Sequence, residues 1–142
     1  MDLAQYIYTT TCTDRMTIEK AVLISEKSVE VCNRLGLTGR VFSTASSTLA
    51  ITEGPATLVG RYVGAVHDDY LLETLIVHAR RPIEAREFSD YSVWLDMNVP
   101  ATSAPHVHIM TPGSLQQALP ANPSAKLRVM ADVFFDQGRL VA

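Results

Sequence analysis

Residues 37–55, LTGRVFSTASSTLAITEGP, contain two short β-prone runs joined by a loop and followed by the start of a helix. The runs are Leu37 to Thr44 and Thr48 to Glu53, and the residues between them match the loop length of a β-hairpin. Gly54-Pro55 then places a proline in the first turn of a helix, where a missing amide hydrogen costs nothing. The stretch therefore predicts strand, strand and helix, in that order.

A strand and a helix precede this hairpin. Residues 3–12 are rich in tyrosine, isoleucine and threonine, which favour a pleated surface. From Thr17, a suitable N-cap, apolar residues recur with the spacing of a one-sided helix as far as Gly36, which supplies a stop. We therefore expect a strand over residues 3–12 and a helix over residues 17–35.

Two further strands are expected after the second helix, which keeps helical spacing up to Asp68-Asp69. Leu72 to Ala79 is rich in β-formers and Pro82 is expected to end that strand, while Tyr91 to Met97 alternates as a fifth strand. The order β-α-β-β-α-β-β predicts an α+β, ferredoxin-like sheet with both helices on one face.

The second face of the sheet also needs cover. Side chains alternate faces along a strand, and odd positions of the first three strands carry apolar residues: Leu3, Ile7, Leu37, Val41, Leu49 and Ile51. After the proline-rich stretch 100–112, apolar residues at 127, 130, 133 and 134 repeat with helical spacing. We expect a helix near residues 124–137, with Ser124 as its N-cap and Gly138 at its end, on this face or on a partner subunit.

The C-terminal part also suggests self-association. Phe134 and Phe135 are adjacent and cannot both face one groove, so a second apolar surface is expected. We divide the chain into a domain over residues 1–98 and a C-terminal extension over 99–142, and we expect a homo-oligomer or a protein partner.

Composition narrows the class of protein. The chain has 142 residues, 47% of them apolar and 19% charged, which is typical of one globular domain. The net charge is -3 and no basic run exceeds Arg80-Arg81, so nucleic acid is not an expected partner. No stretch is apolar enough for a membrane span, and Cys12 and Cys32 show neither disulfide nor zinc spacing. We expect a cytoplasmic protein.

Four motifs, in this order, resemble the BLUF family of small blue-light sensors that use flavin. They are Tyr6-Ile7-Tyr8, Leu37-Thr38-Gly39, Glu53-Gly54-Pro55, and Arg86-Glu87-Phe88 followed by Tyr91-Ser92. The resemblance covers residues 3–97. It implies a flavin between the two helices, an electron-donating tyrosine on the first strand and a glutamine on the third strand whose hydrogen bonds rearrange under light. It also implies an asparagine pair on the first helix and a basic residue on the second helix that hold the flavin.

Only one of these family residues is present in this chain. The tyrosine matches Tyr8, whose even position directs it to the helix-covered face. The asparagine pair falls on Val31 and Cys32, the glutamine on Ala50 and the basic residue on Ala65. Valine and alanine offer no side-chain hydrogen bond, and a thiol is a weak donor. The resemblance thus implies a flavin pocket that has lost most of its contacts.

The binding free energy lost with these flavin contacts indicates whether the chain could still bind the cofactor. Four missing contacts at about 1–2 kcal/mol each would total roughly 4–8 kcal/mol, or about three to six powers of ten in dissociation constant. The Asp-x-Arg-His sequence usual in the family also reads Asp69-Tyr70-Leu71-Leu72 here. We expect a sensor-derived interaction or regulatory module without cofactor. The alternative is a working photoreceptor that binds FAD through an altered pocket.

Four other residues, Asn33, Arg40, His106 and His108, carry side chains suited to binding. Asn33 could replace the missing amide, although a solvated or C-cap role is favoured, and Arg40 either reaches the vacated pocket or lies at the edge of the sheet. His106 and His108 have minimal metal spacing without a third ligand, so no metal is expected. The chain has no Ser-His-Asp order and no phosphate-binding glycine loop, so we do not expect an enzyme.

Overall fold

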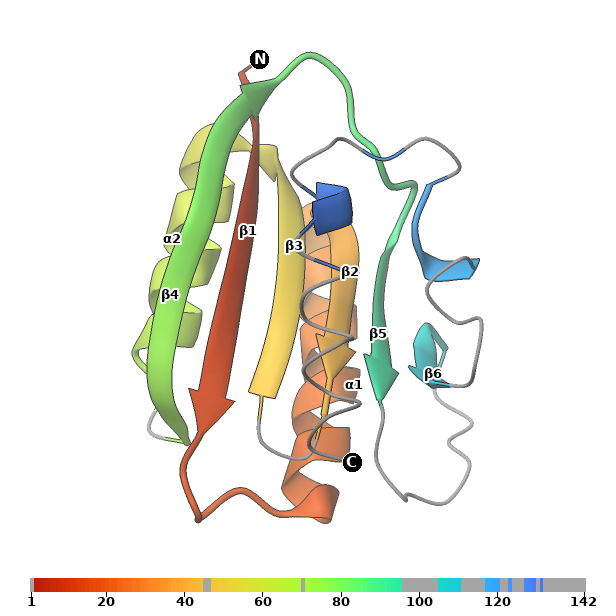
Figure 1. Cartoon of the computed structure of the whole chain (residues 1–142). Coiled ribbons are helices and arrows are strands. Elements are labelled where there is room, and N and C mark those ends of the chain that lie inside the picture. The colour runs from red at the N-terminus through yellow and green to blue at the C-terminus, as the bar shows by residue number, and fades with distance from the viewer. Residues whose placement is uncertain are drawn as a thin grey trace.

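A six-stranded sheet with two helices on one face forms the centre of the molecule (Figure 1). The computed structural model describes residues 2–44, 47–69, 71–95, 105–110, 117–120, 123, 127–129 and 131. The strands are β1 Leu3–Cys12, β2 Thr38–Ser43, β3 Ser47–Pro55, β4 Leu72–Ile83, β5 Tyr91–Leu95 and β6 Val107–Ile109. The helices are α1 Ile18–Leu35 and α2 Ala56–His67. No helix in these ranges is both long and apolar enough to cross a membrane.

The strand order is β4-β1-β3-β2-β5-β6. Strand β3 lies between β1 and β2 and is antiparallel to both, whereas β5 is parallel to β2. This is the split βαβ arrangement, and it confirms the predicted α+β, ferredoxin-like fold. The short strand β6, which adds to β5 in parallel, was not predicted because it lies in a proline-rich stretch without a strand pattern.

The predicted ends of the first helix are confirmed. The Thr17 hydroxyl accepts a hydrogen bond from the Lys20 amide at 3.2 Å, as an N-cap does. Gly36 has a φ of 76° and donates its amide to the carbonyl of Asn33 at 3.2 Å, which ends the helix. Helix α2 begins directly after Pro55, which is its N-cap residue.

Gly39 permits a close approach of two strands. Its φ is +155°, and a Cβ at this position would lie 1.9 Å from the carbonyl oxygen of Ile51 on β3. Any other residue would push β2 and β3 apart at this point. The close packing of β2 on β3 therefore explains why the Leu37-Thr38-Gly39 motif has a glycine, and no ligand is needed to explain it.

Two hydrophobic clusters lie on opposite faces of the sheet. The cluster under the helices includes Tyr8, Val29, Cys32, Ala50, Val59 and Val63. The cluster on the second face includes Ile7, Phe42, Leu49, Ile51, Phe88, Ala118, Leu119, Leu127 and Ala131. In Figure 1 α1 and α2 lie behind the sheet. The described C-terminal residues Ala118, Leu119, Leu127 and Ala131 pack in the cluster on the other face, where the C-terminal segment was predicted. Ser124, Phe134, Phe135 and Gly138 lie outside the described residues.

Two predictions about the strands are wrong. Pro82 does not end the fourth strand, because β4 continues to Ile83 as an edge strand, where a residue without an amide hydrogen is tolerated. Leu37 and Val41 do not share a face with Ile7, since both pack on the helix side. Val41 is paired with Ala50 in the hairpin register, and paired residues point to the same face.

Candidate functional site

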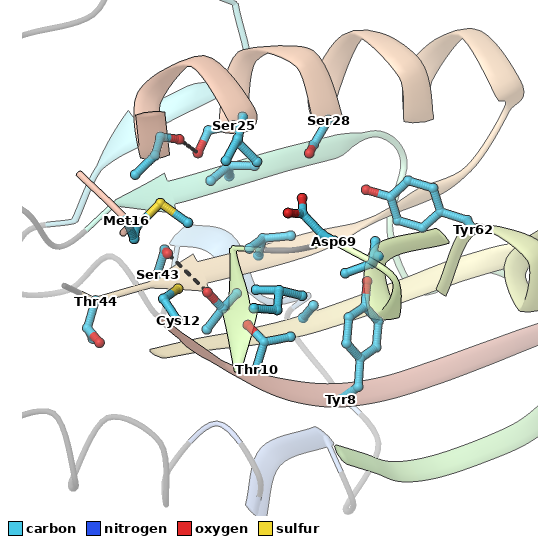
Figure 2. Close-up of a pocket in the computed structure, with 18 of the residues that line it drawn as sticks. Tyr8, Thr10, Cys12, Met16, Ser25, Ser28, Ser43, Thr44, Tyr62 and Asp69 are labelled. Carbon is cyan, nitrogen blue, oxygen red and sulfur yellow. Dashed lines mark hydrogen bonds between the residues drawn. The ribbon is translucent and has the colours of Figure 1, made fainter. Parts of the chain in front are cut away.

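A cavity of about 160 Å³ lies between the two helices and the sheet (Figure 2). Strands supply its floor, and α1 and α2 supply its walls. Its polar lining consists mainly of hydroxyl groups, with apolar side chains between them. The lining residues include Tyr8, Thr10, Cys12, Met16, Ile24, Ser25, Ser28, Val41, Ser43, Thr48, Ala50, Tyr62, Val66, Asp69, Leu72, Tyr91 and Val93.

The structure brings together some of the five predicted pocket positions. Tyr8 and Ala50 both line the cavity, and they are direct partners across β1 and β3. Cys32 is fully buried in the hydrophobic cluster under the helices that also contains Tyr8. Val31 and Ala65 are not among the described lining residues; Val31 is half-buried and Ala65 is exposed.

Three tyrosines meet at one end of the cavity. The Tyr8 hydroxyl lies 3.2 Å from the Thr52 hydroxyl, and the rings of Tyr62 and Tyr91 meet edge to face with centroids 6.4 Å apart. Burial raises the pKa of Tyr8 to about 12, although the Thr52 hydrogen bond lowers it in part. Burial also raises the pKa values of Tyr62 and Tyr91. All three phenols are therefore neutral at physiological pH.

Cys32 lies beside these tyrosines. Burial raises the pKa of its thiol to about 11, and hydrogen bonds with Tyr62 and Tyr91 lower it in part. A thiol is a far weaker nucleophile than a thiolate, so this buried cysteine is chemically inert at neutral pH. The sequence placed Tyr8 here, whereas Tyr62 carried no signal beyond its apolar helical spacing.

Among the described residues that line the cavity, only Asp69 carries a charged side chain. In the view of Figure 2 its carboxylate lies below the Ser28 hydroxyl and to the left of the Tyr62 ring. The Oδ1 atom accepts the backbone amide of Leu71 at 2.9 Å, which fixes the side chain at the end of α2. No lysine or arginine is found among the described lining residues, so the cavity has an acidic character.

A second buried polar group, Glu53, lies outside the cavity and is fully engaged. Its side chain is 0% exposed and accepts four hydrogen bonds. The donors are the Gln5 amide at 3.2 Å, the Thr38 hydroxyl at 2.9 Å, and the backbone amides of Glu87 at 3.1 Å and Phe88 at 2.8 Å. We call these residues the Glu53 network. They join β1, β2, β3 and the connection between β4 and β5.

The expectation for Arg40 is wrong in both of its forms. Arg40 is paired with Ile51 and therefore lies on the second face, away from the cavity. It donates to the carbonyls of Ala118 at 2.9 Å and Asp90 at 2.8 Å, forms an ion pair with Asp90 at 2.9 Å, and stacks 4.9 Å from the Phe88 ring centre. Its role is to fasten the C-terminal segment to the sheet.

Asn33 and the two histidines also have structural partners. The Asn33 side chain donates to the carbonyl of Tyr91 at 3.3 Å and accepts its amide at 3.1 Å, so it joins α1 to β5 rather than entering the cavity. His106 lies 2.9 Å from the carboxylate of Asp90, and the His108 ring stacks on Trp94 with centroids 4.4 Å apart. Within the described ranges, no group of three suitable ligands could hold a metal ion.

Comparison with known proteins gives the same fold and names the family. Residues 3–94 match BLUF, described as sensors of blue-light using FAD. The chain belongs to the BLUF family. No match was found among curated proteins. The BLUF protein BlrB, in its dark state, is similar at 21% identity and a TM-score of 0.61, over 67% of this chain and 74% of that one.

Two larger structures match nearly the whole chain. A bacterial light-regulated adenylyl cyclase is 12% identical with a TM-score of 0.63, and Klebsiella pneumoniae BlrP1 with manganese and cyclic diGMP is 17% identical with a TM-score of 0.66. They cover 98% and 96% of this chain, but this chain spans only 36% and 34% of theirs. These likenesses show the fold alone.

Proposed function

We propose that this BLUF chain is a sensor-derived module that does not bind flavin and acts by contacting proteins, including a second copy of itself. The observation that carries this proposal is the cavity at the place where the family holds its flavin. Its volume of about 160 Å³ is small. A site for a drug-sized ligand usually has roughly 300–1,000 Å³, and a cavity of about 150 Å³ accommodates one benzene ring. An isoalloxazine has three fused rings.

The chemistry of the lining supports the same proposal. Ala50 stands beside Tyr8 where the family has a glutamine, and a methyl group cannot exchange hydrogen bonds with a flavin. Cys32 offers a weakly donating, buried thiol where the family has an amide. The basic residue that the family has on the second helix falls on Ala65 here, so the phosphate side of the cofactor would lack that positive charge. Among the described lining residues no histidine adjoins a serine or cysteine, so we propose no catalytic step.

The free edge of β4 is our candidate for self-association. Strand β4 lies at the edge of the described sheet, and Ile76 and Val77 near its middle are 54% and 42% exposed (Figure 1). An unpaired edge with exposed apolar residues favours pairing with another strand. Glu73 lies toward one end of β4 and Arg80 toward the other, both exposed, so antiparallel pairing of two copies would bring opposite charges together.

An absorption spectrum tests the loss of flavin. We expect the purified full chain to be colourless and to take up no added FAD in equilibrium dialysis. A variant with Val31→Asn, Cys32→Asn, Ala50→Gln and Ala65→Arg is the matched control, because it returns the family's residue types to these positions. A yellow preparation whose flavin spectrum shifts to the red under blue light would refute the proposal and establish the alternative photoreceptor.

Sedimentation measures the self-association. We expect a dimer for the unchanged chain and a monomer for Ile76→Lys, because the lysine charge would be desolvated at a paired edge. Leu23→Lys is the matched control, since Leu23 is 65% exposed on α1, away from this edge. A monomeric unchanged chain, or an Ile76→Lys variant that stays dimeric, would contradict this part of the proposal.

A further inference from the structure

The cavity between α1 and α2 retains space and polar groups that the proposed function does not use. Tyr62, Ile24, Val66 and Leu72 provide aromatic and apolar surface, while several hydroxyls face the same space. Ser28 is half-buried, and its hydroxyl makes no hydrogen bond among the described residues. A space of about 160 Å³ that is both apolar and polar fits a compact molecule of about one ring.

The charge of this molecule follows from Asp69. Its carboxylate lies in the cavity, and its bonded Oδ1 atom accepts one backbone amide, which leaves capacity for further donors. No ion pair to Asp69 occurs among the described residues, and the described lining contains no other charged side chain. A carboxylate in a partly enclosed space attracts a cation and repels an anion.

We infer that the cavity binds a small organic cation: a primary ammonium on a body of about one ring, with the ammonium on Asp69. The ring or alkyl body would lie against Tyr62 and the apolar walls, and tyrosine rings are favourable neighbours of an ammonium. This inference rests on the proposed function, because a flavin and this ligand would occupy the same space. It assigns a ligand of opposite charge to the anionic cofactor of the family.

Three probes of similar shape test the inference on the full chain. Benzylammonium, benzyl alcohol and benzoate are titrated separately, and chemical shifts of backbone amides are followed by NMR. We expect benzylammonium to bind about tenfold more tightly than benzyl alcohol, because a charged hydrogen bond contributes about this much. Benzoate should not bind, and the largest shifts should occur at Ser28, Tyr62 and Asp69.

Variants locate the binding. Asp69→Asn removes the charge but keeps an oxygen for the Leu71 amide, so the fold should persist while benzylammonium affinity drops to that of benzyl alcohol. Asp68→Asn is the matched control: the neighbouring carboxylate is exposed, lies 3.4 Å from His67 and is not among the described lining residues. It should leave the affinity unchanged. Ser28→Phe should fill the cavity and abolish binding of both probes.

The outcomes separate this inference from the proposed function. Benzoate that binds as tightly as benzylammonium, or benzylammonium that binds Asp69→Asn unchanged, would overturn the inference. If neither FAD nor any of the three probes binds, the inference fails while the proposed loss of flavin stands. If FAD itself binds and displaces benzylammonium, the proposed function fails although the cation site exists.

Discussion

The Glu53 network and the cavity are both polar regions in the interior of one small fold, but their hydrogen bonding differs. Every oxygen of the Glu53 carboxylate has donors, and these donors come from β1, β2 and the β4–β5 connection. In the cavity, the Ser28 hydroxyl faces open space. Three of the four motifs that carry the family resemblance contribute residues to the Glu53 network, and the fourth, Tyr6-Ile7-Tyr8, directly follows its Gln5. The motifs therefore reflect in large part a hydrogen-bond network that holds the strands together.

The largest expected effect comes from opening the Glu53 network. Glu53→Ala would leave four donors without their acceptor in a fully buried place, so we expect a loss of about 3–5 kcal/mol in the free energy of unfolding. Urea unfolding followed by circular dichroism measures it. Glu84→Ala, at an exposed site on the same side of the molecule, should change stability by less than about 0.5 kcal/mol. A loss below about 1 kcal/mol for Glu53→Ala would remove the contrast between the two regions.

A smaller effect is expected from alkaline pH at the edge of the cavity. The pKa of Cys32 rises from 9.0 to about 11 on folding. The contribution of this thiol to the free energy of unfolding is therefore fully present below pH 9 and is lost as the pH rises through 11. The loss should be about 2–3 kcal/mol, and Tyr8, with a pKa of about 12, extends it further. Unfolding midpoints from pH 8 to 10 measure the slope, because the raised pKa values of Tyr8, Tyr62 and Tyr91 add to the loss mainly above the ordinary tyrosine pKa of 10. Cys32→Val should flatten it, and an equal slope in both proteins would count against a buried thiol.

The smallest effect is expected within the cavity. Ser28→Ala removes a hydroxyl that has no hydrogen-bond partner among the described residues and places a better helix former on α1. We expect a change of at most about 0.5 kcal/mol, toward greater stability. The same urea titration measures it. A loss above about 1 kcal/mol would mean that the cavity hydroxyls are as tightly engaged as the Glu53 network.

Much of the fold could be predicted because its signals are local. Thr17 and Gly36 mark the ends of α1, and the length of the hairpin loop predicts that β2 and β3 are paired. The face of Arg40 could not be predicted from odd and even numbering alone. The hairpin register pairs Arg40 with Ile51, so even positions of β2 share a face with odd positions of β3. Which positions of two neighbouring strands share a face depends on the turn that joins them. The alternation of residues within one strand does not show it.

The candidate site was predictable in part. The positions of Tyr8 and Ala50 followed from the family resemblance, and both line the cavity. The role of Asp69 did not follow, since a carboxylate near the end of a helix has many uses. Asp69 makes the cavity acidic only because no lysine or arginine is among the described lining residues. Which residues line the cavity together depends on the folded structure. Tyr62 likewise fits the apolar spacing of the second helix, which does not indicate that it lines a cavity.

The cluster on the second face has a practical consequence. Residues 3–94 hold all of the family match, yet Ile7, Phe42 and Leu49 are fully buried together with Leu119 and Leu127 from beyond that range. Arg40 reaches across to Ala118 in the same place. A chain shortened to the matched residues would therefore expose a hydrophobic face of the sheet to water. We expect it to be poorly soluble and prone to aggregate.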